Sequence, residues 1–125
     1  MKSSVLVVCL FLLGLCLQAS ADERAPDAVE IDPDVHHVLI DNEHVRVFRA
    51  IASAGANSPM HSHPPFVLVS LGQARLRMNL PDGETVIFDL MPGEVMWLED
   101  GLEHAWEMLS GEAHVVAIEV KSAAK

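Results

Sequence analysis

Turn signals divide most of this chain into stretches that are too short for a typical α-helix. Beyond residue 34, Gly, Pro or Asp-containing pairs recur every few residues, and no interval between them holds three helical turns with their caps. The intervals alternate in polarity, as where Arg75, Arg77 and Asn79 interleave with Leu76 and Met78. Period-two alternation is typical of strands with one buried face. We therefore predict an all-β domain of about eight strands, folded as a sandwich or barrel.

The same alternation predicts which face of each strand is buried. In the strand predicted at 44–51, Val45 and Val47 alternate with Arg46, so we expect the valines inside and the arginine in water. Further strands are predicted at 75–80, 85–90, 95–98, 104–109 and 115–120.

The first 21 residues have the layout of a signal peptide. A positive charge at Lys2 precedes an apolar run over 5–17 and small residues over 19–21. The run is shorter than the roughly 20 residues that a membrane-spanning helix needs. We expect cleavage after Ala21 and a periplasmic or secreted location. A lipid anchor on Cys16 is the alternative, which the bulky residue before that cysteine disfavours.

Removal of this segment would leave a mature chain without thiols. Both cysteines, Cys9 and Cys16, lie within it, so disulfides and thiolate metal sites are excluded from the mature protein. The remainder has the size of one domain. We expect a flexible arm at 22–34 and a single domain at 35–125.

The charge of the chain disfavours polyanionic partners. The formal net charge is -10 and becomes -11 without Lys2, because residues 1–21 contain no Asp or Glu. An acidic surface repels phosphate backbones and anionic lipids. We therefore expect no nucleic acid partner and no membrane binding after cleavage, and a small molecule as the ligand or substrate.

Two histidines are placed to share one ion. His61 and His63 stand at i and i+2, which puts both imidazoles on one face of a strand. Val67 and Val69 share that face if the strand continues unbroken. Gly55 lies six residues before His61.

A second cluster follows after a short hairpin, with Gly93, Gly101 and His104 in order. Together the two clusters resemble the cupin superfamily, whose motifs read Gly-x5-His-x-His-x3,4-Glu-x6-Gly and Gly-x5-Pro-x-Gly-x2-His-x3-Asn. The resemblance covers about residues 43–121, nearly the whole mature chain. It implies a jelly-roll barrel, also called a double-stranded β-helix, that binds a divalent metal through His61, His63 and His104.

The chain departs from these motifs at four positions. The first motif's glutamate is missing, and so is its closing glycine on strict counting; the second motif lacks its proline and asparagine. The residues at these positions are Val67 or Leu68, Ala74 (with Gly72 two residues earlier), Glu99 and Met108. The resemblance therefore implies a neutral set of three imidazoles, similar to the sites of some cupin dioxygenases.

Three protein ligands leave open positions on a metal ion, as catalytic sites require. Imidazole is compatible with several metals, so Fe, Mn, Zn, Ni and Cu all remain open, and no other cofactor is expected. Trp106 and Met108 share the face of His104, so we expect a pocket that is apolar except at the metal.

The roles of the other histidines and of one acid are less constrained. We expect His36, His37 and His44 at the surface, since they lie outside the motifs. His114 shares strand parity with inward candidates and is left open as a spare ligand. Glu103, beside His104, is left open as a proton acceptor, and no catalytic residue is assigned.

Three functions fit this pattern. The first is a metal-dependent dioxygenase or related enzyme that acts on a small chelating molecule; the second is a module that binds or senses a metal or small ligand without turnover. The third, copper handling, is prompted by Met60, Met96 and Met108, whose scattered positions are better explained by core packing. A homodimer is expected by analogy with other jelly-roll domains.

Overall fold

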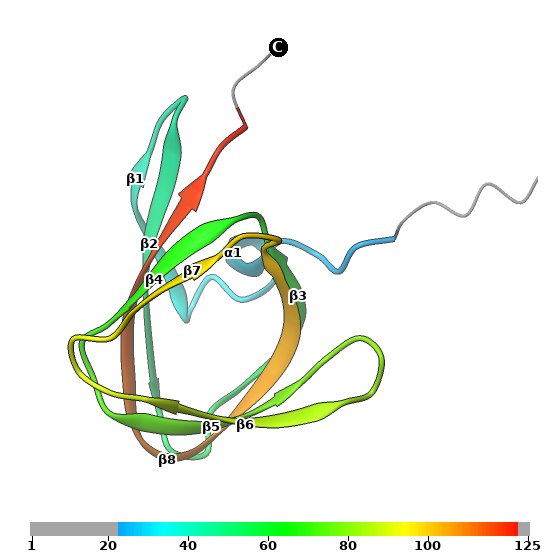
Figure 1. Cartoon of the computed structure of the whole chain (residues 1–125), viewed down its shortest axis with the longest axis vertical. Helices are drawn as coiled ribbons and strands as arrows, with labels where there is room; N and C mark the ends of the chain where they lie inside the picture. Colours follow the sequence, from blue (N-terminus) through cyan, green and yellow to red (C-terminus); the bar gives the residue numbers. More distant parts are fainter. Residues whose placement is uncertain (1–22, 123–125) are drawn as a thin grey trace, which may run out of the picture.

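Eight strands form the wall of a barrel in the computed structural model, which describes residues 23–122 (Figure 1). The prediction of an all-β jelly-roll barrel is confirmed. The elements are α1 (Ala28–Ile31), β1 (His36–Asp41), β2 (Val45–Ser53), β3 (Asn57–His63), β4 (Phe66–Ser70), β5 (Ala74–Asn79), β6 (Thr85–Leu90), β7 (Val95–Leu98) and β8 (Leu102–Val120).

The long strand β8 belongs to both sheets of the barrel. Its first half pairs with β3 and β5, and its second half pairs with β2 and β4. Figure 1 shows it following the barrel wall from β3 round to β2. The strands predicted at 104–109 and 115–120 form one strand, so the break expected between them was wrong. Gly111 instead bends one continuous strand, with φ at 76° and no room for a Cβ against the carbonyl of Gln73.

The buried face of β2 is the opposite of the predicted one. Phe48 and Ala52 are 2% and 7% exposed, whereas Val45 and Val47 are only half-buried on the other face. Arg46 shares the face of Phe48 and points inward, because it donates a hydrogen bond to the buried carboxylate of Glu119. Alternation alone could not show this, since a paired arginine tolerates burial that a free one does not.

β3 and β4 are separate strands, so the condition under which Val67 and Val69 would share the face of His61 and His63 is not met. Pro64 and Pro65 interrupt the chain between them, and the ladder stops where a proline lacks its N–H. The break shifts the parity, so Phe66 and Leu68 face the interior in place of Val67 and Val69.

The segment expected to be a flexible arm is packed against the barrel from residue 25 onward. Asp27 caps α1 by accepting from the N–H groups of Val29 and Glu30, and Ala28 is completely buried. The N–H of Ser62 donates to the carbonyl of Pro26 at 2.8 Å. This N-terminal segment before β1, the lead-in, therefore lies directly beside the strand that carries His61 and His63.

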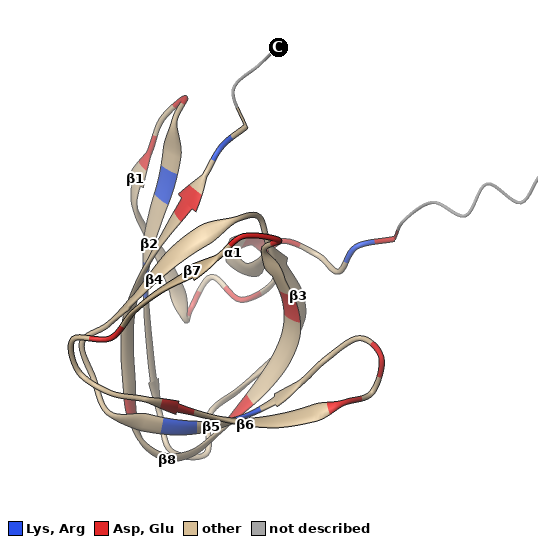
Figure 2. Cartoon of the chain, in the orientation of Figure 1, with Lys and Arg blue, Asp and Glu red and all other residues tan. Residues whose placement is uncertain are grey.

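The predicted signal peptide and both cysteines lie outside the described residues, so their assignment stays a prediction. Within residues 23–122, no helix is long and apolar enough to span a bilayer. Figure 2 shows Asp and Glu spread over strands and loops of the barrel, with fewer Lys and Arg.

Candidate metal centre

The three histidines predicted as ligands converge inside the barrel. His61 and His63 project from β3, and His104 stands directly opposite His61 in the pairing of β3 with β8. The ring centroids of His61 and His104 are 4.6 Å apart, those of His61 and His63 are 4.9 Å apart, and those of His63 and His104 are 5.5 Å apart. All three side chains are buried, and His61 is completely so.

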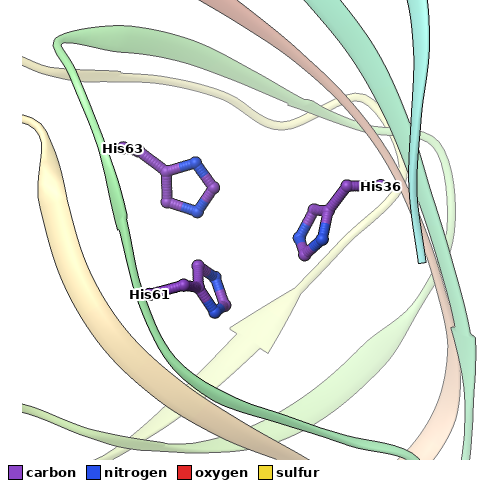
Figure 3. A group of neighbouring side chains, drawn as sticks. All are labelled: His36, His61 and His63. Carbon is purple, nitrogen blue, oxygen red and sulfur yellow. The ribbon is translucent and has the colours of Figure 1, made fainter. Parts of the chain in front are cut away.

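A fourth histidine, His36, joins this cluster, although the sequence predicted it at the surface. His36, the first residue of β1, is 4% exposed, and its ring lies 5.2 Å from that of His61 and 6.0 Å from that of His63. One ring nitrogen from each of His36, His61 and His63 lies within 4.8 Å of the others, and Figure 3 shows the three rings around a common space. His37 and His44 are exposed, as predicted.

No motif marks His36, because it comes from outside the region of resemblance. The pairing of β1 with β2 places it opposite Ala50, on the inner face, while His37 falls opposite Arg49 on the outer face. Strand parity distinguishes the two neighbours only once the register of this pair is known.

The Nδ1 atoms of the cluster have hydrogen-bond acceptors, which leaves the Nε2 atoms free. Nδ1 of His36 lies 3.0 Å from the carbonyl of Asp32, and Nδ1 of His61 lies 2.7 Å from that of Pro59. Nδ1 of His63 lies 3.1 Å from a carboxylate oxygen of Glu119. A carbonyl only accepts, so His36 and His61 carry their proton on Nδ1, and their Nε2 lone pairs are available to a metal ion.

The unpartnered nitrogen of His61 tests whether these residues fit a metal. Its Nε2 is fully buried and has no hydrogen-bond partner among the described residues. A buried acceptor left in this way destabilises the fold by about 1–3 kcal/mol, and native proteins usually avoid it. A cation held between neighbouring imidazoles would satisfy this atom, so the donor set fits a divalent metal.

The protonation of the cluster also suits a metal. Burial, with a smaller effect from the positive charge that the neighbouring imidazoles can carry, lowers the pKa of His61 to about 4 and that of His104 to about 2. Burial likewise lowers the pKa of His36, against the opposing effect of its bond to Asp32. These rings are neutral at pH 7, which is the form that coordinates metal.

Comparison with solved structures identifies the family. A cupin domain protein from Bordetella pertussis Tohama I superposes with a TM-score of 0.63 and 27% identity, over 80% of this chain and 99% of its own. The chain belongs to the cupin superfamily. An RmlC-like cupin from Methanocaldococcus jannaschii has a TM-score of 0.54 and 16% identity, covering 69% of this chain and 78% of its own. A DMSP lyase from Ruegeria pomeroyi has a TM-score of 0.55 and 19% identity, covering 74% of this chain and 50% of its own.

No family model and no curated protein matches the chain. The assignment to the cupins therefore rests on the barrel and on solved structures.

A motif glycine of this cupin brings the two histidine-bearing strands together. Gly101 has φ at 72°, and a Cβ at this position would overlap with the carbonyl oxygen of His63. The turn before β8 therefore contacts the backbone at the end of β3, which only glycine permits. This close approach sets the position of β8, and of His104 three residues later, relative to His63.

A chain of buried ionic contacts leads from His63 of the cluster to the cap of α1. Glu119, 1% exposed, contacts Nδ1 of His63 and accepts at 2.7 Å from Nε of Arg46. Arg46 also donates at 2.6 Å to Asp27, the cap of α1. Burial raises the pKa of Asp27, but the bond to Arg46 and its positive charge outweigh this and lower the pKa overall. The lead-in, β2 and β8 are thus linked to one imidazole.

The two residues left open by the sequence do not face the cluster. Glu103 lies opposite Ser62 on the far face of β8, where it accepts from the N–H of Ala25 at 2.7 Å. His114 alternates with the buried Ala113 and Val115 and so points away from the interior. Glu103 is therefore not a proton acceptor at the cluster, and His114 is not a spare ligand.

The methionines considered for copper do not form a cluster with one another. Met60 alternates with the inward histidines of β3, Met108 is 1% exposed in the core, and Met96 lines the interior. A different methionine touches the cluster, because Sδ of Met78 lies 3.3 Å from Nδ1 of His104.

The interior of the barrel holds a cavity of about 170 Å³ beside the cluster. His36, His63 and His104 border it, and Trp106 and Leu68 form part of its wall. The predicted apolar pocket next to the histidines is present.

Proposed function

We propose that this cupin binds one divalent metal ion through His61, His63 and His104, with His36 as a further ligand, and takes a small molecule in the adjoining cavity. The observation that carries the proposal is the buried, unpartnered Nε2 of His61 at the centre of four imidazoles. Neutral imidazoles leave the full +2 charge of the ion to polarise a ligand oxygen.

The number of imidazole ligands affects whether the site can catalyse a reaction. A tetrahedral ion held by four protein ligands has no open position, whereas a six-coordinate ion would keep two. A metal of octahedral preference such as Fe or Mn would therefore suit a dioxygenase-like enzyme, and four-coordinate Zn would suit a binding module. Ni and Cu remain in the set of metals to be tested.

An enzyme acting on a small chelating molecule is our first candidate function. Cupin neighbours include a DMSP lyase and a polyketide cyclase, so this fold supports enzyme sites. The second candidate is a module that binds a metal or ligand without turnover. It is favoured by the position of Glu103, since the part of the chain that the structure describes then offers no acid or base in the cavity wall besides the histidines.

The metal is tested by elemental analysis of the purified protein after reconstitution with each metal. We expect one ion per chain in the wild type and none in a His61→Ala, His63→Ala double variant. A His37→Ala, His44→Ala variant changes two exposed histidines and should retain the metal. Wild-type protein that retains no metal would contradict the proposal.

Turnover is tested separately, by following oxygen uptake of the metal-loaded protein with β-diketones, thiols and flavonols. Oxygen uptake that disappears in the double variant would support the enzyme. One bound metal without turnover of any of these compounds would favour the binding module.

We also propose that the protein is exported and cleaved after Ala21, on the layout of its first 21 residues. Mass spectrometry of the mature protein from a secreting host should give a chain that begins at Asp22. Recovery of the uncleaved chain from the cytoplasm would contradict export.

The predicted homodimer is part of the proposal. Val95 and Trp97 on the edge strand β7 are 65% and 54% exposed, an unusual cost for apolar side chains in water. Sedimentation velocity should show a dimer that Trp97→Lys converts to a monomer. A wild-type monomer at micromolar concentration would contradict the dimer.

A further inference from the structure

The cavity beside the histidines has a size that restricts its ligand. Its volume is about 170 Å³, and an apolar cavity of about 150 Å³ is enough to bind benzene. The part of a ligand that lies inside this cavity is therefore no larger than a small aromatic ring or a short branched chain.

The titratable side chains of the cavity wall lie beside one another. Among residues 23–122, the titratable side chains that border the cavity are His36, His63 and His104, and no Lys, Arg, Asp or Glu of this range lines it. A carboxylate or ammonium group placed away from the histidines would lose its hydration without gaining a partner, which is strongly unfavourable. The wall therefore selects against ligands with a second charged group.

Small side chains on one sheet create the space. Ala52 on β2 stands directly opposite Ala113 on β8, and Ala50 and Ala117 lie on the same inner face. Larger side chains close the other side of the cavity, among them Leu76, Phe88 and Trp106. The alanine pair is thus the part of the wall whose enlargement would fill the cavity with least effect on the histidines.

We propose that this cavity binds a small molecule whose apolar body, free of charged groups, lies against Ala52 and Ala113 and whose polar end points to His36, His63 and His104. The polar end rests on the proposed metal function, whereas the apolar end rests on the cavity alone. Ala52 and Ala113 then determine the size of the ligand.

Toluene, benzyl alcohol and benzoate test this inference, since they share one ring and differ in the attached group. Binding is measured by isothermal titration and by chemical shift changes of cavity methyl groups, on metal-free and zinc-loaded protein. We expect toluene to bind both forms, benzyl alcohol to bind the zinc-loaded form at least as tightly, and benzoate to bind the metal-free form at least tenfold more weakly than toluene.

Substitutions that fill the cavity provide the second arm. Ala52→Leu and Ala113→Leu should each weaken toluene binding at least tenfold, while Ser53→Leu, on the exposed face next to Ala52, should leave it unchanged. Circular dichroism checks that each variant folds, and the smaller change Ala52→Val replaces a variant that does not.

The outcomes separate this inference from the metal proposal. Absence of toluene binding to folded metal-free protein would overturn the inference even if one zinc ion binds per chain. Benzoate binding to the metal-free form as tightly as toluene would also overturn it. Toluene binding to a protein that takes up no metal would uphold the apolar end and contradict the metal proposal alone.

Discussion

Glu119 and His63 are 56 residues apart in the chain, and a carboxylate oxygen of Glu119 lies 3.1 Å from Nδ1 of His63. Both side chains are buried, and the remaining carboxylate oxygen of Glu119 accepts from Arg46. Acceptors of this kind fix the orientation of a ligand imidazole and increase its basicity. This cupin thus has a carboxylate next to the candidate site, bonded to one of its imidazoles instead of lying among them.

Replacement of Glu119 by Gln should weaken metal binding. Loss of such a supporting partner typically costs about 10- to 100-fold in metal affinity, and we expect a decrease in that range by competition with a chromophoric chelator. Glu107→Gln is the matched control, because Glu107 pairs with Arg77 on the exposed face. Equal affinities of the two folded variants would contradict a supporting role for Glu119.

Adjacent histidines on β1 give a sharp test of the fourth ligand. His36→Ala should lower metal affinity at least tenfold, because it removes a buried imidazole whose ring lies 5.2 Å from that of His61. His37→Ala changes the same residue type on the outer face and should leave affinity unchanged. The account of His36 fails if both variants retain wild-type affinity in the same titration.

Gly101 should be more sensitive to substitution than Gly83, a turn glycine with open space around it. Gly101→Ala places a Cβ against the backbone of His63, whereas Gly83→Ala at φ 87° meets no atom within 4 Å. We expect a loss of about 1 kcal/mol for Gly83→Ala from the backbone conformation alone, and a larger loss for Gly101→Ala. Urea unfolding of the two variants measures both losses in the free energy of unfolding. Equal losses would show that the turn at Gly101 can move away from His63 at little cost.

The metal-free protein should lose stability as the pH falls below 6.5. Burial lowers the pKa of His61 to about 4, so the unfolded chain takes up a proton at this residue near pH 6.5 while the folded chain does not. The pKa values of His36 and His104 are lowered in the same direction. The stabilisation is therefore complete above pH 6.5 and decreases towards pH 4.

Urea unfolding of metal-free protein at pH 7.5, 6, 5 and 4.5 measures this dependence. The free energy of unfolding should decrease steadily below pH 6.5, and the decrease should be smaller in His61→Gln. A free energy that stays constant from pH 7.5 to 4.5 would contradict neutral buried imidazoles.

Much of the fold and part of the site could be predicted from local patterns. The polar and apolar sets of β5 alternate as expected, with Arg75 and Arg77 exposed and Leu76 buried. The cluster was indicated by His61 and His63 on one strand face and by His104 at the motif spacing after Gly101. These signals are local, because strand parity and turn positions depend on neighbouring residues.

What could not be predicted depends on contacts between distant segments. His36 joins the cluster through the register of β1 with β2, and Arg46 is turned inward by Glu119, 73 residues later. The course of β8 past Gly111 depends on the carbonyl of Gln73. None of these relationships leaves a local periodicity that a single sequence reveals.

X-ray absorption at the metal edge of zinc-reconstituted protein tests the central claim most directly, because it counts the imidazoles around the ion. We predict multiple scattering from four imidazoles in the wild type and from three in His36→Ala. A first shell made mainly of water or carboxylate oxygen, unchanged by the loss of His61 and His63, would contradict the metal centre described for this barrel.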